Sequence, residues 1–288
     1  AHATHARRAI VAGGGQLGLE AARGLVSRGL EVDVVHSGPH LLHGQLDPEG
    51  GDVLRRHVEA LGIAVHTGLH VSAVHPQSGQ LRAVKLSDGY LLDCDVFVIA
   101  CGSRPAVRLA VAAGLGTAGG IVVDDQLRTD DETIHAIGDC AQHRGIEGNQ
   151  AWTAWAQADV LADVLLGSDA RYVAGQQVVR LRAAGIDVAA VGEPVATECD
   201  DQLGTDVVRL RNPARGSYKR LAFRDNRLVG GVLVGDTDGA AALAAALARP
   251  WLPASPAALL LGTAAAAARR ESGDASAFPD NAPVCACN

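Results

Sequence analysis

The first hundred residues alternate between apolar runs and amphipathic stretches, as a parallel sheet with covering helices requires. "RRAIVAGGGQLGLEAARGLVSRGLEVDVVHSG" contains an apolar strand, a glycine turn, a stretch with helical spacing that ends at Gly29, and a second strand. A helix ending near Gly62 and the strand "AVHTG" follow. "CDVFVIACG" is almost continuously apolar, which is typical of a strand buried on both faces. The pattern predicts an α/β domain over residues 7–108.

An antiparallel insertion interrupts this domain before its last strand. "VSAVHPQSGQLRAVKLSDGYLLDCDVF" alternates between apolar and polar residues, with turns at Ser78-Gly79 and Asp88-Gly89. The next segment, "GGIVVDDQLRTDDETIHAIGDCAQ", predicts two short strands around an acidic loop, followed by a helix from about Trp152 to Leu166. We assign residues 109–168 to this second region.

A third region begins near Tyr172 and predicts a small α+β domain over residues 169–262. "DVVRLRN", "SYKRLAF" and "RLVGGVLVG" predict a three-stranded meander with turns at "PARG" and "RDN". A helix capped at Thr237 or Asp238 and ended by Pro250 follows. Residues 263–288 turn polar and rich in Ser, Gly, Asp and Pro, which is typical of a linker. We expect the domain from 169 to serve as a cover or a dimer surface, because no chemically reactive residues converge in it.

Composition narrows the classes of partner. The chain is 48% hydrophobic, carries a net charge of −7 and has no run of basic residues, so we expect neither nucleic acid nor an anionic membrane as a partner. The most apolar tract, at residues 240–270, is broken by Arg249 and three prolines, so it predicts no membrane span. Six scattered cysteines do not form a secreted disulfide framework, which favours the cytoplasm. Since the chain contains no methionine, we expect a fragment or a processed product.

A glycine-rich motif between the first strand and the first helix carries the clearest chemistry. Its residues are Gly13, Gly14, Gly15, Gln16, Leu17 and Gly18, and they match the dinucleotide-binding pattern G-x-G-x-x-G. Gly13 permits the tight turn, Gly15 lets the backbone approach a pyrophosphate, and Gly18 lets the helix pack on the strand. The alternative is a glycine turn that binds no ligand.

Two polar residues downstream of the motif have open roles. An NAD site usually has an acidic residue about 20 positions further on, at the end of the second strand, where this chain has His36. His36 could bond a ribose hydroxyl, or a 2′-phosphate if it is protonated, or it could be a polar strand end that touches nothing. The preference between NADH and NADPH is therefore open. Glu20, expected in the first helical turn, would be favoured there by the helix dipole alone.

Two later motifs also allow more than one reading. Asp139 follows a strand-like run and precedes an expected helix start, where an aspartate is most often an N-cap. The chain ends in "PVCACN", whose Cys285 and Cys287 could be half of a metal site, a redox pair or an idle tail. Two thiolates supply at most half of the ligands of a zinc ion or a typical iron-sulfur cluster.

Taken together, six stretches resemble the flavoprotein part of the large subunit of assimilatory NAD(P)H nitrite reductase and the electron-transfer subunit of assimilatory nitrate reductase. They are "AIVAGGGQLGLEAARGL", "VVHSGPHLLHGQLDPEGGDVLRRHVEALGI", "VIACGSRP", "GIVVDDQLRTDDETIHAIGDCAQHRG", "GSYKRLAFRDNRLVGGVLVGD" and "PDNAPVCACN". The resemblance runs over nearly the whole chain in the family's order. It implies a Rossmann-like NAD(P)-binding domain, the returning segment of an FAD domain, and a small α+β C-terminal domain.

The resemblance also implies roles for single residues. The motif glycines would hold the NAD(P)H pyrophosphate, Glu20 would lie near the nicotinamide, and Gly102 would lie in the turn that returns the chain to the FAD domain. Gly138 and Asp139 resemble the second flavin motif, in which the carboxylate accepts a hydrogen bond from a ribityl hydroxyl. Cys285 and Cys287 would be the first two ligands of a [2Fe-2S] centre that is completed only in a longer chain, and we expect them to be unmetallated here.

The function implied by the resemblance is electron transfer from NAD(P)H through FAD, and in an intact protein through the [2Fe-2S] centre, towards nitrite or nitrate reduction by a redox partner domain or subunit. In this family a first half of the FAD domain, with its own glycine fingerprint, precedes the position where this chain begins. Two alternatives remain. The chain could be a catalytically silent nucleotide-binding or assembly module, or it could come from another flavoprotein of the ferredoxin or rubredoxin reductase type. The latter shares the pattern up to residue 168.

Overall fold

The computed structural model describes residues 6–147, 151–174, 178–192, 204–247 and 260. These residues divide into two compact units. The first combines the described parts of residues 1–102 and 176–275, and the second lies within residues 103–175. Each unit is described by itself.

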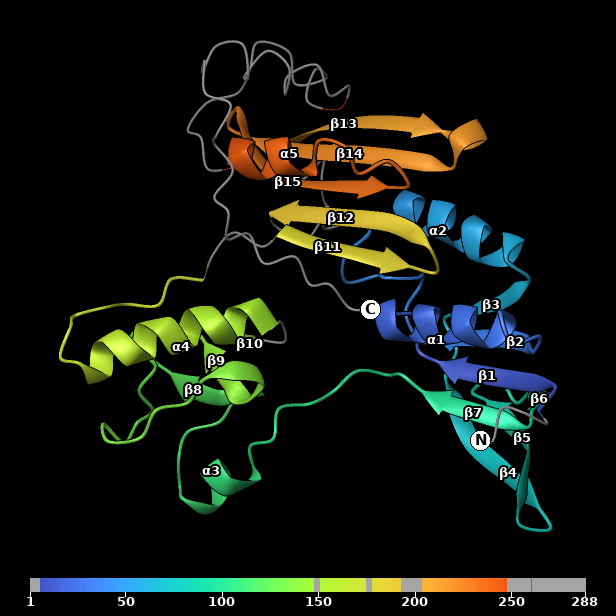
Figure 1. The fold of residues 1–288 in the computed structure, drawn as a ribbon, viewed down its shortest axis with the longest axis horizontal. Coiled ribbons are helices and arrows are strands. Elements are labelled where there is room, and N and C mark those ends of the chain that lie inside the picture. Colours follow the sequence, from blue (N-terminus) through green and yellow to red (C-terminus); the bar gives the residue numbers. More distant parts are fainter. Residues whose placement is uncertain (1–5, 148–150, 175–177, 193–203, 248–259, 261–288) are drawn as a thin grey trace. The chain divides into compact units, whose positions relative to one another are not determined.

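A four-stranded parallel sheet forms the amino-terminal part of the first unit (Figure 1). Its strands are β1 (Arg8–Ala12), β2 (Glu31–His36), β3 (Ile63–Thr67) and β7 (Val96–Ile99), in the order β3-β2-β1-β7. Helix α1 (Gln16–Val26) follows β1, and α2 (Pro48–Ala60) connects β2 to β3. The parallel α/β sheet predicted from the sequence is therefore confirmed, with the glycine motif at the carboxyl end of β1.

The predicted antiparallel insertion is a separate small sheet. It consists of β4 (Val71–Gln77), β5 (Gln80–Leu86) and β6 (Leu91–Asp93). Ser78 and Gly79 have φ angles of 52° and 77°, which are the left-handed values that a two-residue hairpin turn needs. Val84 and Leu86 pack with Cys94 against Ile10 of the parallel sheet, so the insertion is anchored by a small apolar cluster of its own.

The carboxyl-terminal part of the first unit is a five-stranded antiparallel sheet, and the prediction of three strands was incomplete. The strands are β11 (Val178–Ala183), β12 (Ile186–Gly192), β13 (Thr205–Asn212), β14 (Ser217–Arg224) and β15 (Arg227–Val234), in the order β11-β12-β15-β14-β13. The missed hairpin turns at Ala184-Gly185, where both φ angles are positive. The turns predicted at "PARG" and "RDN" are confirmed, because Gly216, Asp225 and Asn226 adopt left-handed backbone.

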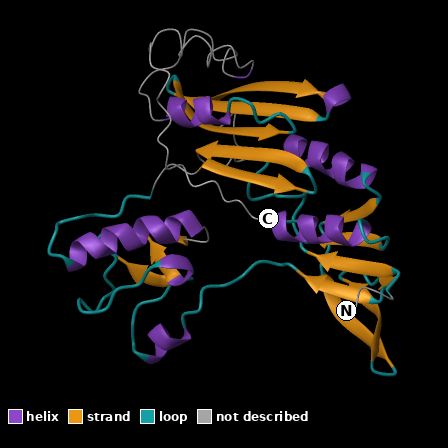
Figure 2. Ribbon diagram, in the orientation of Figure 1, coloured by secondary structure: helices purple, strands orange, loops and turns teal. Residues whose placement is uncertain are grey.

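The central strands β12, β14 and β15 of this sheet carry most of its buried residues, whereas no residue of the edge strand β13 is buried (Figures 1 and 2). One face packs against the α1 and α2 side of the parallel sheet in a common core that includes Val188, Tyr218 and Val234. The other face packs on α5 (Ala240–Leu247) through residues such as Leu221 and Leu243. Within the first unit the sheet therefore covers the two helices of the parallel domain.

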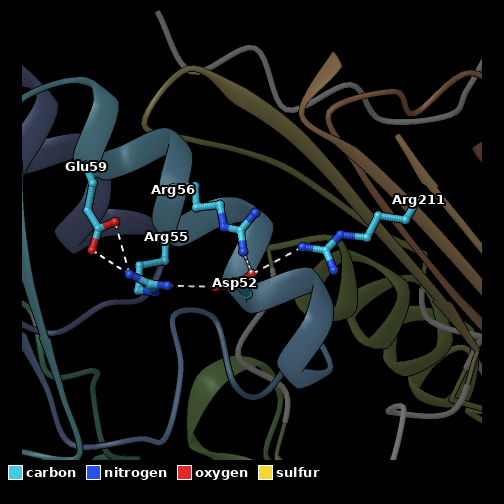
Figure 3. A network of polar contacts seen from close by, with 5 residues as sticks. All are labelled: Asp52, Arg55, Arg56, Glu59 and Arg211. Carbon is cyan, nitrogen blue, oxygen red and sulfur yellow. Dashed lines mark hydrogen bonds and ion pairs between the residues drawn. The ribbon is translucent and has the colours of Figure 1, made fainter. Parts of the chain in front are cut away.

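Polar contacts also join α2 to the antiparallel sheet. Asp47 is the N-cap of α2, where its Oδ1 accepts the Gly50 N–H, and its Oδ2 accepts the Tyr218 hydroxyl of β14 at 2.5 Å. Arg220 Nε lies 3.6 Å from the same Oδ2, and all three side chains are buried. One turn further along α2, Asp52 pairs with Arg55 and Arg56 of its own helix and with Arg211 of β13 (Figure 3).

The second unit is small. It contains α3 (Arg108–Ala112), β8 (Ile121–Val123), the 3₁₀ turn η2 (Gly138–Cys140), β9 (Ala141–His143), β10 (Ile146–Glu147) and α4 (Ala151–Leu165). β8 and β9 are parallel, and β10 pairs antiparallel with β9. The strand predicted within "TIHAIG" is wrong, because that run forms only an isolated bridge between His135 and Arg128. In the part of the chain that the structure describes, no helix is long and apolar enough to cross a bilayer.

Candidate functional site

The glycine loop between β1 and α1 is shaped by two close backbone approaches. Gly13 has a φ of 120°, and a Cβ added there would lie 2.1 Å from the carbonyl oxygen of Ala100. A Cβ at Gly18 would lie 1.9 Å from the carbonyl oxygen of Gly13. Real Cβ atoms do not approach other atoms so closely, so both positions require glycine for the fold itself.

Gly15 differs, because no neighbouring atom among the described residues excludes a side chain there. Its backbone is extended, with a φ of −83°, and an added Cβ would meet no atom within 4 Å. Gly15 is also the N-cap of α1, and it offers no side chain to the first helical N–H groups. Uncapped amides at a helix N-terminus attract anions, so the loop presents a donor-rich surface that a side chain would obstruct. Gln16 and Leu17 of the same motif are exposed.

His36, at the end of β2, is buried beneath this loop rather than exposed beside it. Its Nδ1 accepts the Gly14 N–H at 3.1 Å, and its Nε2 lies 2.9 Å from Nδ1 of His43. Because Nδ1 accepts a hydrogen bond, His36 is neutral and carries its proton on Nε2. Burial, and then the neighbouring His43, hold the pKa of His36 below its usual value. Both ring nitrogens are therefore engaged, and direct contact with a ribose stays a prediction that needs rearrangement of the ring.

Glu20 lies in the second turn of α1, so the expectation of a first-turn acid stabilised by the helix dipole is wrong. The helix begins at Gln16 and has no acidic residue in its first turn. Glu20 Oε2 lies 3.9 Å from Arg23 Nη1, whereas its Oε1 is buried without a hydrogen-bond partner among the described residues. The side chain as a whole is 38% exposed, so its carboxylate has acceptor capacity for a donor on a bound ligand.

The carboxyl end of β7 contributes the other side of the loop. Ala100 N–H donates to the carbonyl oxygen of Ala12, and the Cys101 thiol lies 3.4 Å from the same oxygen. Gly102 follows with a φ of 88°, and an added Cβ would meet no atom within 4 Å. This turn ends the first of the two chain segments that form the first unit, which is where the resemblance places the return to the FAD domain.

In the second unit, Gly138 and Asp139 lie in the 3₁₀ turn η2. The expectation that Asp139 caps a helix is wrong, because Ile137 is the N-cap of η2 and α4 begins only at Ala151. Gly138 N–H donates to Oε1 of the buried Gln157 at 2.7 Å, which fixes the turn to α4. The Asp139 side chain is exposed, and no hydrogen bond or ion pair involves its carboxylate among the described residues.

A buried histidine supports the strand after this turn. His143 Nε2 lies 2.9 Å from Asp125 Oδ1, and Arg144 pairs with the other oxygen of Asp125. The hydrogen bonds from Arg144 and His143 lower the pKa of Asp125 to about 2. The ring of Tyr172 meets that of His143 edge-on, with centroids 5.0 Å apart. Sequence reasoning missed this cluster, because its members are separated by up to 47 residues.

The predicted metal ligands Cys285 and Cys287 lie outside the described residues. Within those residues, no group of three or more His, Cys, Asp or Glu side chains is arranged to hold a metal ion.

The sequence model of the pyridine nucleotide-disulphide oxidoreductase family matches residues 1–158, which is more than half of the chain and includes the glycine loop and the turn at Asp139. The chain belongs to this family. A second model, of the rubredoxin NAD⁺ reductase C-terminal domain, matches residues 178–249. The likeness to rubredoxin reductases therefore extends beyond residue 168 and includes the antiparallel sheet.

Relatives of this oxidoreductase chain agree with the resemblance drawn from its motifs. It is 34% identical to the nitrite reductase (NADH) large subunit of Escherichia coli over 99% of the chain and 34% of the relative. It is 32% identical to the assimilatory nitrate reductase electron transfer subunit of Bacillus subtilis over 82% of the chain and 30% of the relative. The chain thus spans about a third of the length of these curated relatives.

Solved structures of related proteins have the same fold. A ferredoxin reductase from Rhodopseudomonas palustris is 31% identical, with a TM-score of 0.72 over 81% of this chain and 57% of that structure. A pyridine nucleotide-disulphide oxidoreductase from Desulfovibrio vulgaris matches with a TM-score of 0.75 over 93% of this chain and 72% of that structure, at 24% identity. The predicted fold class is therefore confirmed.

Proposed function

We propose that this chain is the NAD(P)H-binding part of a flavoprotein reductase that passes electrons from NAD(P)H through FAD towards nitrite or nitrate reduction. The observation that carries the proposal is the state of Gly15. Close backbone contacts explain the glycines at 13 and 18, whereas no such contact explains the glycine at 15. Glycine is an acceptable N-cap, and the open space beside it fits a ligand that approaches the backbone. The uncapped start of α1 beside it supplies amides for a pyrophosphate.

The same loop fits the rest of a dinucleotide. The Glu20 carboxylate, one turn into α1, has acceptor capacity for a donor, and the carboxamide of a nicotinamide would supply one. The turn at Gly102 lies at the carboxyl end of β7, the edge of the sheet where ligands of open α/β folds bind. Gly13, Gly15 and Gly18 would form the cradle, and Gln16 and Leu17 would flank it.

A flavin contact fits the second unit. Gly138 and Asp139 would hold the ribityl chain of FAD, because the exposed Asp139 carboxylate has acceptor capacity for hydroxyl groups and Gln157 fixes the turn that carries it. When bound, the nicotinamide and the flavin supply the hydride and electron transfer chemistry. The residues of this chain bind and orient the two groups, and we assign none of them as a general acid or nucleophile.

The relatives support the direction of electron flow. They are named as nitrite reductases that use NADH or NAD(P)H and as the electron transfer subunit of an assimilatory nitrate reductase. In a longer chain, Cys285 and Cys287 would be two of the four ligands of a [2Fe-2S] centre that receives electrons from the flavin. A second candidate acceptor is a rubredoxin or ferredoxin, which the match of residues 178–249 to the rubredoxin reductase domain favours.

Hydrogen exchange with and without NADH tests the proposal. Bound NADH should slow exchange of the amides at 13–20, and the segment at 71–93 in the antiparallel insertion serves as an internal control. An absorbance spectrum of the purified chain should be recorded in parallel, because a flavin band would report whether this chain holds FAD. If saturating NADH and NADPH leave the exchange of 13–20 unchanged, the dinucleotide assignment is wrong.

A further inference from the structure

The turn that follows β2 lies directly on the glycine loop. Leu42 N–H donates to the carbonyl oxygen of Gly14 at 3.0 Å, and the Leu41 side chain fills the space where a Gly14 Cβ would stand, 2.6 Å away. His43 is thus one residue from a backbone hydrogen bond to the loop. Any ligand held by the loop therefore has this turn as its neighbour.

His36 and His43 form an oriented pair at this junction. Since His36 Nδ1 accepts the Gly14 N–H, its Nε2 carries the proton and donates to Nδ1 of His43. Neutral His43 must then carry its own proton on Nε2, at the far end of the pair. The ring centroids are 4.9 Å apart. The hydrogen-bond chain therefore sets His43 as a donor at its outer nitrogen.

Gly38 makes room for this pair. A Cβ at Gly38 would lie 2.4 Å from His43 Nδ1 and 2.8 Å from His36 Nε2, so a side chain there would displace the rings. His36 is buried and His43 is exposed, so the pair runs from the loop to the surface.

The charge around the pair suits an anion. In dinucleotide sites that select NAD, a carboxylate at the end of the second strand accepts the ribose 2′-hydroxyl and repels a 2′-phosphate. Between Val34 and Leu46 this chain contains no aspartate or glutamate. Where the fold family has an acceptor, the pair presents an outward N–H donor, and a phosphate oxygen accepts a stronger hydrogen bond from such a donor than a hydroxyl does.

We propose that His43, oriented by the buried His36, contacts the 2′ substituent of the adenosine ribose and favours the 2′-phosphate of NADPH over the 2′-hydroxyl of NADH. The inference rests on the proposed dinucleotide site and adds the nucleotide preference to it. His36 is a positioning residue that acts through Gly14 and His43. His43, rather than His36, would contact the ribose.

Calorimetric titration of the full chain with NADP⁺, NAD⁺, adenosine 2′,5′-bisphosphate and AMP tests the proposal, because the last two probes differ only in the 2′-phosphate. We expect the wild-type chain to bind the 2′-phosphorylated member of each pair more tightly. His43→Ala should weaken NADP⁺ roughly tenfold, as loss of one charge-assisted hydrogen bond does, and change NAD⁺ less than twofold. His43→Glu should weaken NADP⁺ further by repulsion.

Two further variants separate a specific role from a structural one. His75→Ala removes an exposed imidazole from β4 and should leave all four affinities unchanged. His36→Asn keeps an acceptor for the Gly14 N–H but loses the bond to His43, so it should reduce the NADP⁺ preference while NAD⁺ still binds. Nitrogen chemical shifts of the wild-type rings should show Nδ1 unprotonated in both histidines.

Each outcome is decisive. Equal affinity of the wild-type chain for NADP⁺ and NAD⁺, or an equal loss of both in His43→Ala, overturns the inference and leaves the dinucleotide site standing. Failure of the wild-type chain to bind any of the four probes overturns the proposed function, and this inference with it.

Discussion

The buried contact between Tyr218 and Asp47 should be the strongest single polar link between α2 and the antiparallel sheet. Tyr218→Phe removes only the hydroxyl that donates to Asp47 Oδ2 at 2.5 Å, while the ring stays in the core. The Tyr218 side chain is fully buried and Asp47 is 4% exposed, so water cannot replace the lost donor. The pKa of Tyr218 is raised, by burial first and then by Asp47, so its hydroxyl keeps the proton it donates.

The expected cost follows from the charge on the acceptor. A hydrogen bond to a charged group contributes roughly 1.5–3 kcal/mol, so we expect the free energy of unfolding of the first unit to fall by about 2 kcal/mol. The amides of α2 and β14 should then exchange about thirtyfold faster, under conditions in which the exchange rate reports the opening equilibrium. That readout is specific to the first unit.

The Asp52 network supplies the matched comparison. Asp52→Asn breaks the ion pair to Arg211 of the sheet and two pairs within α2, but Asp52 is partly exposed and its arginine partners are 40–58% exposed (Figure 3). Screened surface pairs contribute little, so the expected cost is about 1 kcal/mol or less. If Tyr218→Phe accelerates exchange less than twofold, or if Asp52→Asn accelerates it equally, the reasoning from burial is refuted.

Three further outcomes follow from the structure. Because the pKa of His36 is lowered in the folded chain, the unfolded chain binds the proton first, and the free energy of unfolding of the first unit should fall as pH drops below about 6.5. Denaturant unfolding from pH 7.5 to 5.5 measures this fall. No fall in the wild type, or the same fall in His36→Asn, contradicts the prediction. Burial raises the pKa of the Cys94 thiol to about 11, whereas Cys101 is exposed. Iodoacetamide at pH 8, followed by mass spectrometry, should therefore label Cys101 at least tenfold faster than Cys94. Equal labelling rates would count against the burial of Cys94. Gln157→Ala leaves the Gly138 N–H without its buried acceptor and should lower the free energy of unfolding of the second unit by about 1–3 kcal/mol. Thermal unfolding measures this change, and an unchanged midpoint would show that the bond is dispensable.

Local patterns in the sequence were sufficient for the strands and helices of the parallel domain, but the burial expected for "CDVFVIACG" was wrong, because β7 is an edge strand with no buried residue. The spacing of the glycines, the apolar strand before them and the helical period after them together predict β1, the loop and α1, because each of these features depends on neighbouring residues. The hairpin turns at Ser78 and Asn226 were predictable for the same reason. The β11 and β12 hairpin was missed, since the turn residues Ala184-Gly185 carry a weaker signal than Asn-Gly or Asp-Gly.

Contacts between distant residues were not predictable. Tyr218 and Asp47 are 171 positions apart, and no local pattern pairs them. The partner of His36 is seven residues away but depends on the space that Gly38 leaves, which becomes evident only in three dimensions. The helix predicted from about Trp152 is α4, but Asp139 does not cap it, because β9 and β10 lie between the two.

The measurement that tests the central claim most directly is the affinity of the chain for NADPH before and after Gly15→Ala. The extended backbone of Gly15 accepts alanine without a clash, and the lower entropy of the unfolded chain offsets the poorer N-cap, so thermal stability should stay close to that of the wild type. Gly24→Ala, further along α1, where an added Cβ meets only Arg28 Nη1 at 3.7 Å, is the matched control. The account predicts that Gly15→Ala weakens NADPH at least tenfold while Gly24→Ala does not. Unchanged affinity in a folded Gly15→Ala chain would show that no pyrophosphate approaches this loop.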